Sequence, residues 1–209
     1  MKEPTVACCR RIERPEWNLW PEGKGEGGMN QMPSVTEGLR PFQDFSRVSP
    51  ERLEAAAARG SGVHQVCAAI AKGLWWASEI PEDQRGYVKS FEKWMDAAVA
   101  QVLLVEQRLD CACYGYTGQP DLVVMFKGDD GATVVDLKSP VIEGPTWKGQ
   151  LAAYNHLVQC NGQAVQRQGA LMLSPKGKMA NLKEYHSKED FSAFLSALTA
   201  FRYFTKQKE

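Results

Sequence analysis

A short hairpin in the middle of the chain limits the folds that this sequence can adopt. Residues 121–126 (Asp-Leu-Val-Val-Met-Phe) and 132–138 (Ala-Thr-Val-Val-Asp-Leu-Lys) are mostly apolar runs of strand length. Between them, residues 128–131 (Gly-Asp-Asp-Gly) have the composition of a tight turn. The two runs predict neighbouring antiparallel strands, so the fold of this chain has to contain a β-sheet.

Segments with helical periodicity stand on both sides of the hairpin. Ser49-Pro50 is a typical helix start, and we expect this helix to end near Ala58 because Gly60 and Gly62 follow. In four further stretches, apolar residues recur at steps of three or four, as on one face of a helix. These stretches run from Val63 to Leu74, from Tyr87 to Ala98, from Trp147 to Val158 and from Phe191 to Phe201.

Further short strands complete the pattern at residues 102–105, 169–174 and 179–185. The order is therefore helices, three strands, helix, two strands, helix. This order predicts one α/β domain over residues 32–209, with a mixed central sheet flanked by helices. Residues 1–31 are rich in glycine and proline, and we expect them to form a flexible N-terminal arm.

Composition restricts the function only loosely. Lys plus Arg equal Asp plus Glu at 25 each, so the net charge predicts no particular partner. No apolar run is long enough to span a membrane, and the N-terminus lacks the apolar core of a secretory signal. We therefore expect a cytoplasmic protein without membrane contact. The six cysteines contain no separated C-x-x-C pairs, so we expect reduced thiols rather than a zinc site.

Three charged residues of the hairpin are candidates for metal-dependent chemistry. With the turn centred near Asp129, Asp121 falls within about one residue of the position opposite Asp136, and such neighbours lie roughly 5 Å apart at Cβ. Two carboxylates that close need a proton or a cation between them, and Mg²⁺ suits oxygen ligands. Lys138 shares a strand face with Asp136, where its ammonium group could orient a metal-bound water or offset charge on a phosphate.

Three residues outside the hairpin could complete this site. Gln150 and Tyr154 share a helix face, so their polar ends could reach Lys138 or a phosphate. His64 lies beside an apolar stripe, and a neutral imidazole is an ordinary metal ligand. Each residue also has a structural interpretation, as a solvent-facing charge, a half-buried tyrosine or a capping histidine. The functional interpretation rests on their combination.

Taken in order, the motifs resemble the PD-(D/E)XK nuclease superfamily. The matching runs are residues 118–121 (Gly-Gln-Pro-Asp), 134–138 (Val-Val-Asp-Leu-Lys) and 150–154 (Gln-Leu-Ala-Ala-Tyr). The last run, together with residues 62–64 (Gly-Val-His), is similar to the RecB-like branch. Residues 33–36 (Pro-Ser-Val-Thr) resemble the phage-type exonucleases and the mitochondrial genome maintenance exonuclease of that branch.

The resemblance implies a restriction-endonuclease-like core and a metal-dependent DNA exonuclease that hydrolyses phosphodiester bonds in phage or prophage recombination or DNA processing. It implies that the metal, Mg²⁺ or Mn²⁺, is held by His64, Asp121, Asp136 and the carbonyl of Leu137. Lys138 would position the attacking water. Gln150 and Tyr154 would orient Lys138 or the DNA backbone. Glu106 would assist a second metal.

DNA is the partner that the resemblance implies, and Lys148, Lys176 and Lys178 are the expected phosphate contacts. No cysteine follows Cys160, so we expect no iron–sulfur cluster. A site-specific or structure-specific endonuclease on the same fold, a catalytically inactive DNA-binding module and an unrelated α/β domain are the alternatives. A homo-oligomer and a recombination partner protein stay open, and the expected location is a bacterial or phage-infected host cell.

Overall fold

The computed structural model describes residues 32–46, 48–74, 79–139 and 143–205. The expected N-terminal arm falls on residues 1–31, which lie outside the described residues. In the described ranges, no helix combines the length and the apolar character needed to cross a bilayer.

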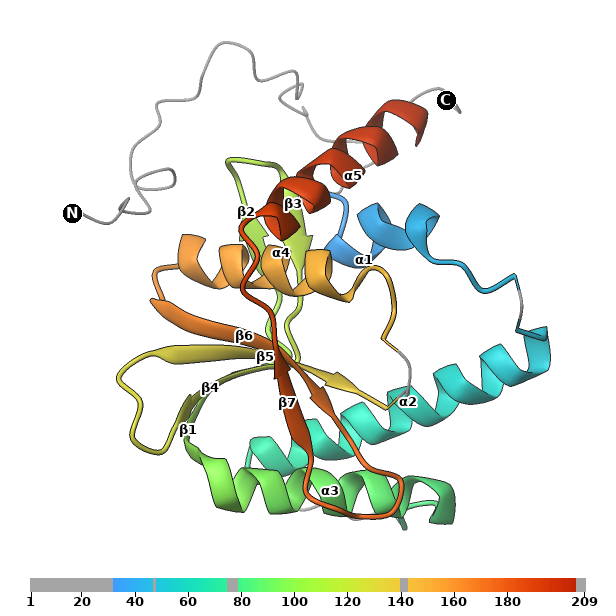
Figure 1. Cartoon of the computed structure of the whole chain (residues 1–209), viewed down its shortest axis with the longest axis vertical. Coiled ribbons are helices and arrows are strands. Elements are labelled where there is room, and N and C mark those ends of the chain that lie inside the picture. Colours follow the sequence, from blue (N-terminus) through green and yellow to red (C-terminus); the bar gives the residue numbers. More distant parts are fainter. Residues whose placement is uncertain (1–31, 47, 75–78, 140–142, 206–209) are drawn as a thin grey trace, which may run out of the picture.

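A five-stranded mixed sheet forms the centre of the fold (Figure 1). Its strand order is β1-β4-β5-β6-β7. The neighbours β4 and β5 are antiparallel, with Leu122 opposite Val135, whereas β5 and β6 are parallel. This arrangement confirms the expected α/β class with a mixed sheet. The strands are β1 (Val99–Val105), β4 (Leu122–Phe126), β5 (Ala132–Lys138), β6 (Val165–Met172) and β7 (Asn181–Glu184).

Helices cover both faces of this sheet. Figure 1 shows α1, α4 and α5 on one side and α2 and α3 on the other. Alternate residues of β5 therefore enter different cores, with Val134 packed toward α4 and α5 and Val135 toward α2 and α3. Burial on both faces explains why this strand is almost continuously apolar. The helices are α1 (Val35–Leu39), α2 (Pro50–Ala71), α3 (Glu82–Ala98), α4 (Trp147–Cys160) and α5 (Glu189–Thr205).

Helix α2 is continuous, so the expected break at Gly60 and Gly62 was wrong. A glycine inside a helix costs about 1 kcal/mol relative to alanine, and the buried apolar residues that follow, such as Val63, offset this cost. Gly62 also has a packing role. A Cβ atom there would lie 2.6 Å from the amide end of the Gln84 side chain, so glycine leaves room for this side chain of α3.

Local sequence patterns did not predict four short elements that lie before the hairpin. Helix α1 begins at a capping box in which Ser34 and Glu37 bond each other's backbone N–H groups, and a 3-10 turn, Arg40–Phe42, follows it. Strands β2 (Leu109–Cys111) and β3 (Tyr116–Gly118) form a separate two-stranded sheet. The backbone N–H of Thr117 donates to the Pro33 carbonyl, so α1 is fixed to β3 near the start of the Gly-Gln-Pro-Asp run.

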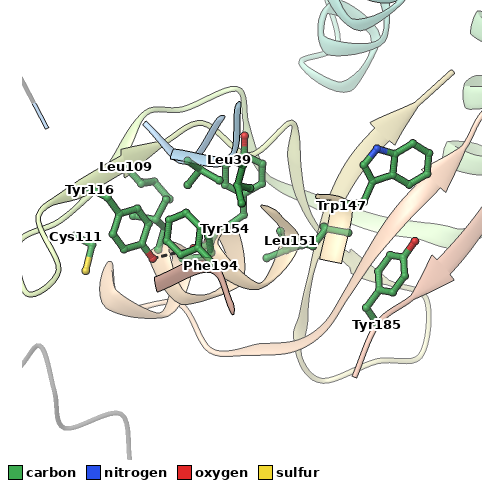
Figure 2. Close-up of a cluster of buried hydrophobic side chains, with 14 of the residues drawn as sticks. Leu39, Leu109, Cys111, Tyr116, Trp147, Leu151, Tyr154, Tyr185 and Phe194 are labelled. Carbon is green, nitrogen blue, oxygen red and sulfur yellow. Dashed lines mark hydrogen bonds between the residues drawn. The ribbon is translucent and has the colours of Figure 1, made fainter. Parts of the chain in front are cut away.

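The core between the sheet and α4 is built from large side chains (Figure 2). Tyr116 and Phe194 meet edge to face with ring centroids 4.9 Å apart, and Leu151 is fully buried beside them. Each such side chain stabilises the fold by about 1.5–3 kcal/mol. Tyr154 belongs to the same cluster, so the helix that carries two predicted site residues is firmly packed.

Candidate functional site

The predicted site residues converge at the carboxyl end of β5. This strand contributes two of them, and a third stands immediately before β4 in the neighbouring position of the sheet. The others come from the helices on the two opposite faces. The residues are Asp136 and Lys138 on β5, Asp121 before β4, His64 on α2, and Gln150 and Tyr154 on α4.

Asp121 is placed by the register of the hairpin. Leu122 pairs with Val135 in the antiparallel register, so the next pair along the two strands is Asp121 and Asp136. This is the arrangement that the position of the turn predicts. Its Oδ2 accepts a 2.7 Å hydrogen bond from the backbone N–H of Leu137. In an extended strand the N–H and C=O of one residue point to the same side. The Leu137 carbonyl therefore faces the Asp121 side of the strand as well.

His64 joins helix α2 to this end of the sheet. Its Nδ1 lies 3.3 Å from Asp121 Oδ1, and the buried neighbour Val63 anchors that turn of the helix. Burial lowers the pKa of His64, but the hydrogen bond and the negative charge of Asp121, with a further contribution from Asp136, outweigh it and raise the pKa above its ordinary value. The protonated imidazole is thus stabilised by the two neighbouring carboxylates.

Asp136 is the most deeply buried charged residue of the site, at 2% exposure. Asp136 lies on the face of β5 that α4 covers, whereas the alternation of apolar and polar residues along the strand would leave this face open to solvent. Burial raises the pKa of Asp136 to about 6, although Lys138 and His64 act in the opposite direction. Lys138 Nζ lies 2.5 Å from Asp136 Oδ2. Oδ2 is buried, and the Lys138 ammonium group is its ionic partner.

Gln150 connects the charged pair through its side-chain amide. Its Oε1 accepts a 3.1 Å hydrogen bond from Lys138 Nζ, and its Nε2 donates to Asp136 Oδ1 at 3.2 Å. The same Nε2 donates to the Tyr154 hydroxyl at 3.3 Å. Burial raises the pKa of Tyr154, so the phenol keeps its proton at neutral pH. The shared helix face predicted for Gln150 and Tyr154 is therefore a direct contact.

Sequence reasoning missed Trp147 as part of the site. The Lys138 ammonium lies over its indole ring, 5.1 Å from the ring centroid, a typical cation–π distance. In the sequence, Trp147 is only the first apolar position of α4, and no local pattern connects it to Lys138. The ring shields one side of the ammonium, which leaves fewer directions from which water can reach it.

A cavity of about 320 Å³ opens beside Asp121 and Tyr154. Glu106 and Arg108 also line it, so it contains both acidic and basic groups. The Glu106 backbone N–H donates to the Asp121 carbonyl at 3.0 Å, and its carboxylate lies 4.0 Å from Lys72 Nζ. Glu106 is therefore next to the site. A larger hollow of about 540 Å³ is lined by α5 side chains, and none of the predicted site residues lines it.

The three lysines expected to contact DNA are all exposed. Lys148 lies in the first turn of α4, next to Trp147. Lys176 and Lys178 lie in the connection between β6 and β7, beyond the same end of the sheet as Lys138. Lys93 of α3 holds this connection by donating to the Gly177 carbonyl at 2.6 Å. The positions leave all three ammonium groups accessible to a large anionic ligand.

The donor set at the end of β5 fits a hard divalent cation. Two carboxylates, from Asp121 and Asp136, and the Leu137 carbonyl supply oxygen atoms of the kind that Mg²⁺ and Mn²⁺ prefer. Asp121 and Asp136 stand opposite each other on neighbouring strands, and the deep burial of Asp136 favours a cation beside these carboxylates. His64 could add a nitrogen if its contact with Asp121 were exchanged for the metal.

Known proteins match this chain in structure but not in sequence. No protein-family model and no curated protein matches its sequence. Sixteen chains of solved structures match its fold. One is the crystal structure of a candidate exonuclease from Eubacterium rectale, with a TM-score of 0.46 and 13% sequence identity over 88% of this chain and 85% of the other. At this TM-score and identity the likeness supports no statement about this chain's activity, and membership of the PD-(D/E)XK superfamily stays a prediction from the motifs.

Proposed function

We propose that this protein is a Mg²⁺- or Mn²⁺-dependent deoxyribonuclease that hydrolyses phosphodiester bonds as an exonuclease. The observation that carries the proposal is the buried Asp136, which contacts Lys138 and Gln150 and stands opposite Asp121. The exonuclease mode, and a role in phage recombination or DNA processing, rest on the motif resemblance.

The energetics of Asp136 favour a functional role over a structural one. A carboxylate that is almost fully buried pays a large desolvation penalty, and apolar residues of similar volume often stabilise a fold better than a buried ion pair does. Strongly perturbed acids of this kind concentrate at active sites. Binding a cation during the reaction would explain why the fold tolerates the desolvation penalty of Asp136.

The side chains of this site have distinct tasks in such a reaction. A bound divalent cation would polarise the scissile phosphate and lower the pKa of water. Gln150 and Asp136 hold the Lys138 ammonium in place, so its remaining N–H donors can orient a water molecule or a phosphate oxygen. Asp121 is itself oriented by the Leu137 N–H and by His64, which fixes one carboxylate before any ligand arrives.

DNA is the substrate that the surroundings of the site support best. Lys148 is exposed on the turn of α4 that carries Trp147, and Arg108 lines the cavity next to Asp121. Basic groups around a cation site suit a polyanionic backbone, and their contribution to binding should weaken as salt rises.

The test is cleavage of linear duplex and single-stranded DNA by the purified chain with Mg²⁺, with Mn²⁺ and with chelator. We expect cleavage with either cation, none with chelator, and none by Asp136→Asn. Asp130→Asn is the matched control, since this exposed acid lies in the turn of the same hairpin and should leave activity unchanged. Full activity of Asp136→Asn would overturn the proposal.

The form of the DNA separates the alternatives. An exonuclease degrades linear DNA but leaves covalently closed circles intact, whereas an endonuclease also cuts the circles. DNA binding without cleavage under every cation would instead support the inactive binding module.

A further inference from the structure

A second group of metal-ligand side chains lies toward the other end of α4. Cys111 comes from β2, and His156 and Cys160 are one helical turn apart on α4. Their ligand atoms all lie within 4.8 Å of one another. The group is separate from the carboxylate site, because Gln150 precedes His156 by six residues, or about 9 Å along a helix. Figure 2 shows Cys111 beside Tyr116 at one end of the core.

Two of the three distances within this group match those around a tetrahedral zinc ion, and the third is slightly longer. The two sulfur atoms of Cys111 and Cys160 are 3.9 Å apart, and His156 Nδ1 lies 3.9 Å from the first and 3.5 Å from the second. With Zn–S bonds of about 2.3 Å and Zn–N bonds of about 2.0–2.1 Å, tetrahedral zinc separates two sulfurs by about 3.8 Å and a sulfur from a nitrogen by about 3.5 Å.

We propose that Cys111, His156 and Cys160 bind a zinc ion, with a fourth donor completing the tetrahedron. Mixed thiolate and imidazole ligands favour zinc over the hard cations that suit carboxylates. Binding would displace one proton from each thiol, so two thiolates form and two protons are released. The lack of separated C-x-x-C pairs predicted no zinc site, but these ligands lie far apart in the sequence and meet only after folding.

The imidazole of His156 suits this exchange. Burial lowers the pKa of His156, so its ring is neutral at pH 7 and has a lone pair to offer. The Tyr116 hydroxyl lies 2.9 Å from His156 Nδ1 and also donates to the Ala153 carbonyl at 3.1 Å. The latter bond can stay when the ring binds a metal.

The position of the site indicates a structural task. Zinc would connect α4, which carries Gln150 and Tyr154, to β2, which pairs with β3 ahead of Asp121. Such a link would fix the helix over the carboxylates. The task does not depend on the proposed nuclease reaction, and its test uses metal content and spectra rather than activity.

The experiment measures zinc in the full chain purified without chelator, and then the absorption of the chain after exchange of zinc for Co²⁺. We expect one zinc per chain and a thiolate-to-cobalt charge-transfer band in the near ultraviolet, which carboxylate ligands cannot produce. Cys160→Ser and His156→Gln should each weaken zinc binding by at least about tenfold. Cys67→Ala, a buried thiol on α2, and Asp136→Asn should keep the zinc and the band.

If the ligand variants fail to fold, the wild-type chain still decides the question. Zinc should protect Cys111 and Cys160 from alkylation in the native protein, as read by mass spectrometry of peptides. Absence of zinc together with absence of the cobalt band would overturn the proposal. A Cys111–Cys160 disulfide in the metal-free protein, with no zinc uptake after reduction, would overturn it in favour of a redox pair.

Discussion

The ammonium group of Lys138 lies 2.5 Å from the carboxylate of Asp136, in a place that water hardly reaches. The two side chains are unequal partners, because the Lys138 side chain is 14% exposed and that of Asp136 only 4%. Lys138 has further contacts with Gln150 and the Trp147 ring. Because of this asymmetry, we expect removal of the Lys138 charge to lower the free energy of unfolding more than removal of the Asp136 charge does.

Lys138→Met should destabilise the metal-free protein by about 3 kcal/mol or more, since it leaves a buried carboxylate without its cation. It should also abolish cleavage. Chemical denaturation gives the free energy of unfolding, and a loss below about 1 kcal/mol would mean that Asp136 is far better solvated than its burial indicates.

Asp136→Asn should change stability by less than about 1 kcal/mol, in either direction, because the neutral amide avoids the desolvation penalty and Lys138 can still bond Gln150. Cleavage should nevertheless be lost together with the metal-binding oxygen. A variant that is as stable as the wild type but inactive separates function from folding, and differential scanning calorimetry beside the cleavage assay measures both.

The stability of the metal-free protein should fall as pH rises from 5 to 7.5. The folded-state pKa of Asp136 is raised from 3.8 to about 6, so the fold favours its protonated form and loses that contribution as pH rises through about 6. The raised pKa of His64 acts with the same sign. Unfolding curves at several pH values should show a smaller decline for Asp136→Asn, and Mn²⁺ should restore wild-type stability at pH 7.5. An equal decline in both proteins would contradict the assignment.

Gln150→Ala should reduce the cleavage rate by about 10- to 100-fold by freeing Lys138 and Asp136 from their shared partner. Gln159→Ala is the matched control, because this glutamine lies on the same helix and bonds Asn155 instead of the site. Rates at saturating DNA show the effect on the reaction itself. Equal cleavage rates for the two variants would show that Gln150 does not position Lys138 and Asp136 for the reaction.

Gly118→Ala should destabilise the fold by about 1–3 kcal/mol through overpacking. A Cβ atom at Gly118 would lie 2.7 Å from Leu157 and 2.9 Å from Tyr154, both of which are buried. Gly60→Ala is the contrasting variant, since among the described residues its Cβ would meet Ser139 alone, at 3.9 Å, and it should stabilise α2 by up to about 1 kcal/mol. Thermal unfolding of both variants checks the difference in sign.

The sequence predicted those parts of the fold that local patterns determine. Strand β5 and helices α3 and α4 follow from the spacing of their apolar residues, and the hairpin turn correctly places Asp121 opposite Asp136. The continuity of α2 could not be predicted, because it depends on the burial of Val63 and its neighbours against other elements. Strands of three residues, such as β2, are too short to show a period.

The candidate site shows the same division. The contact between Gln150 and Tyr154 follows from helical spacing alone. The burial of Asp136 does not, since it results from α4 packing over β5. The meeting of Cys111 with His156 and Cys160 depends on the two-stranded sheet that local patterns missed, although the four-residue spacing on α4 is visible in the sequence.

Single-turnover cleavage of an end-labelled linear duplex, with Mn²⁺ binding measured on the same samples, tests the central claim most directly. The account predicts that the wild type binds Mn²⁺ and cleaves, that Lys138→Met still binds Mn²⁺ but does not cleave, and that Asp136→Asn does neither. Cleavage by Lys138→Met at the wild-type rate, or by Asp136→Asn at any comparable rate, would contradict it.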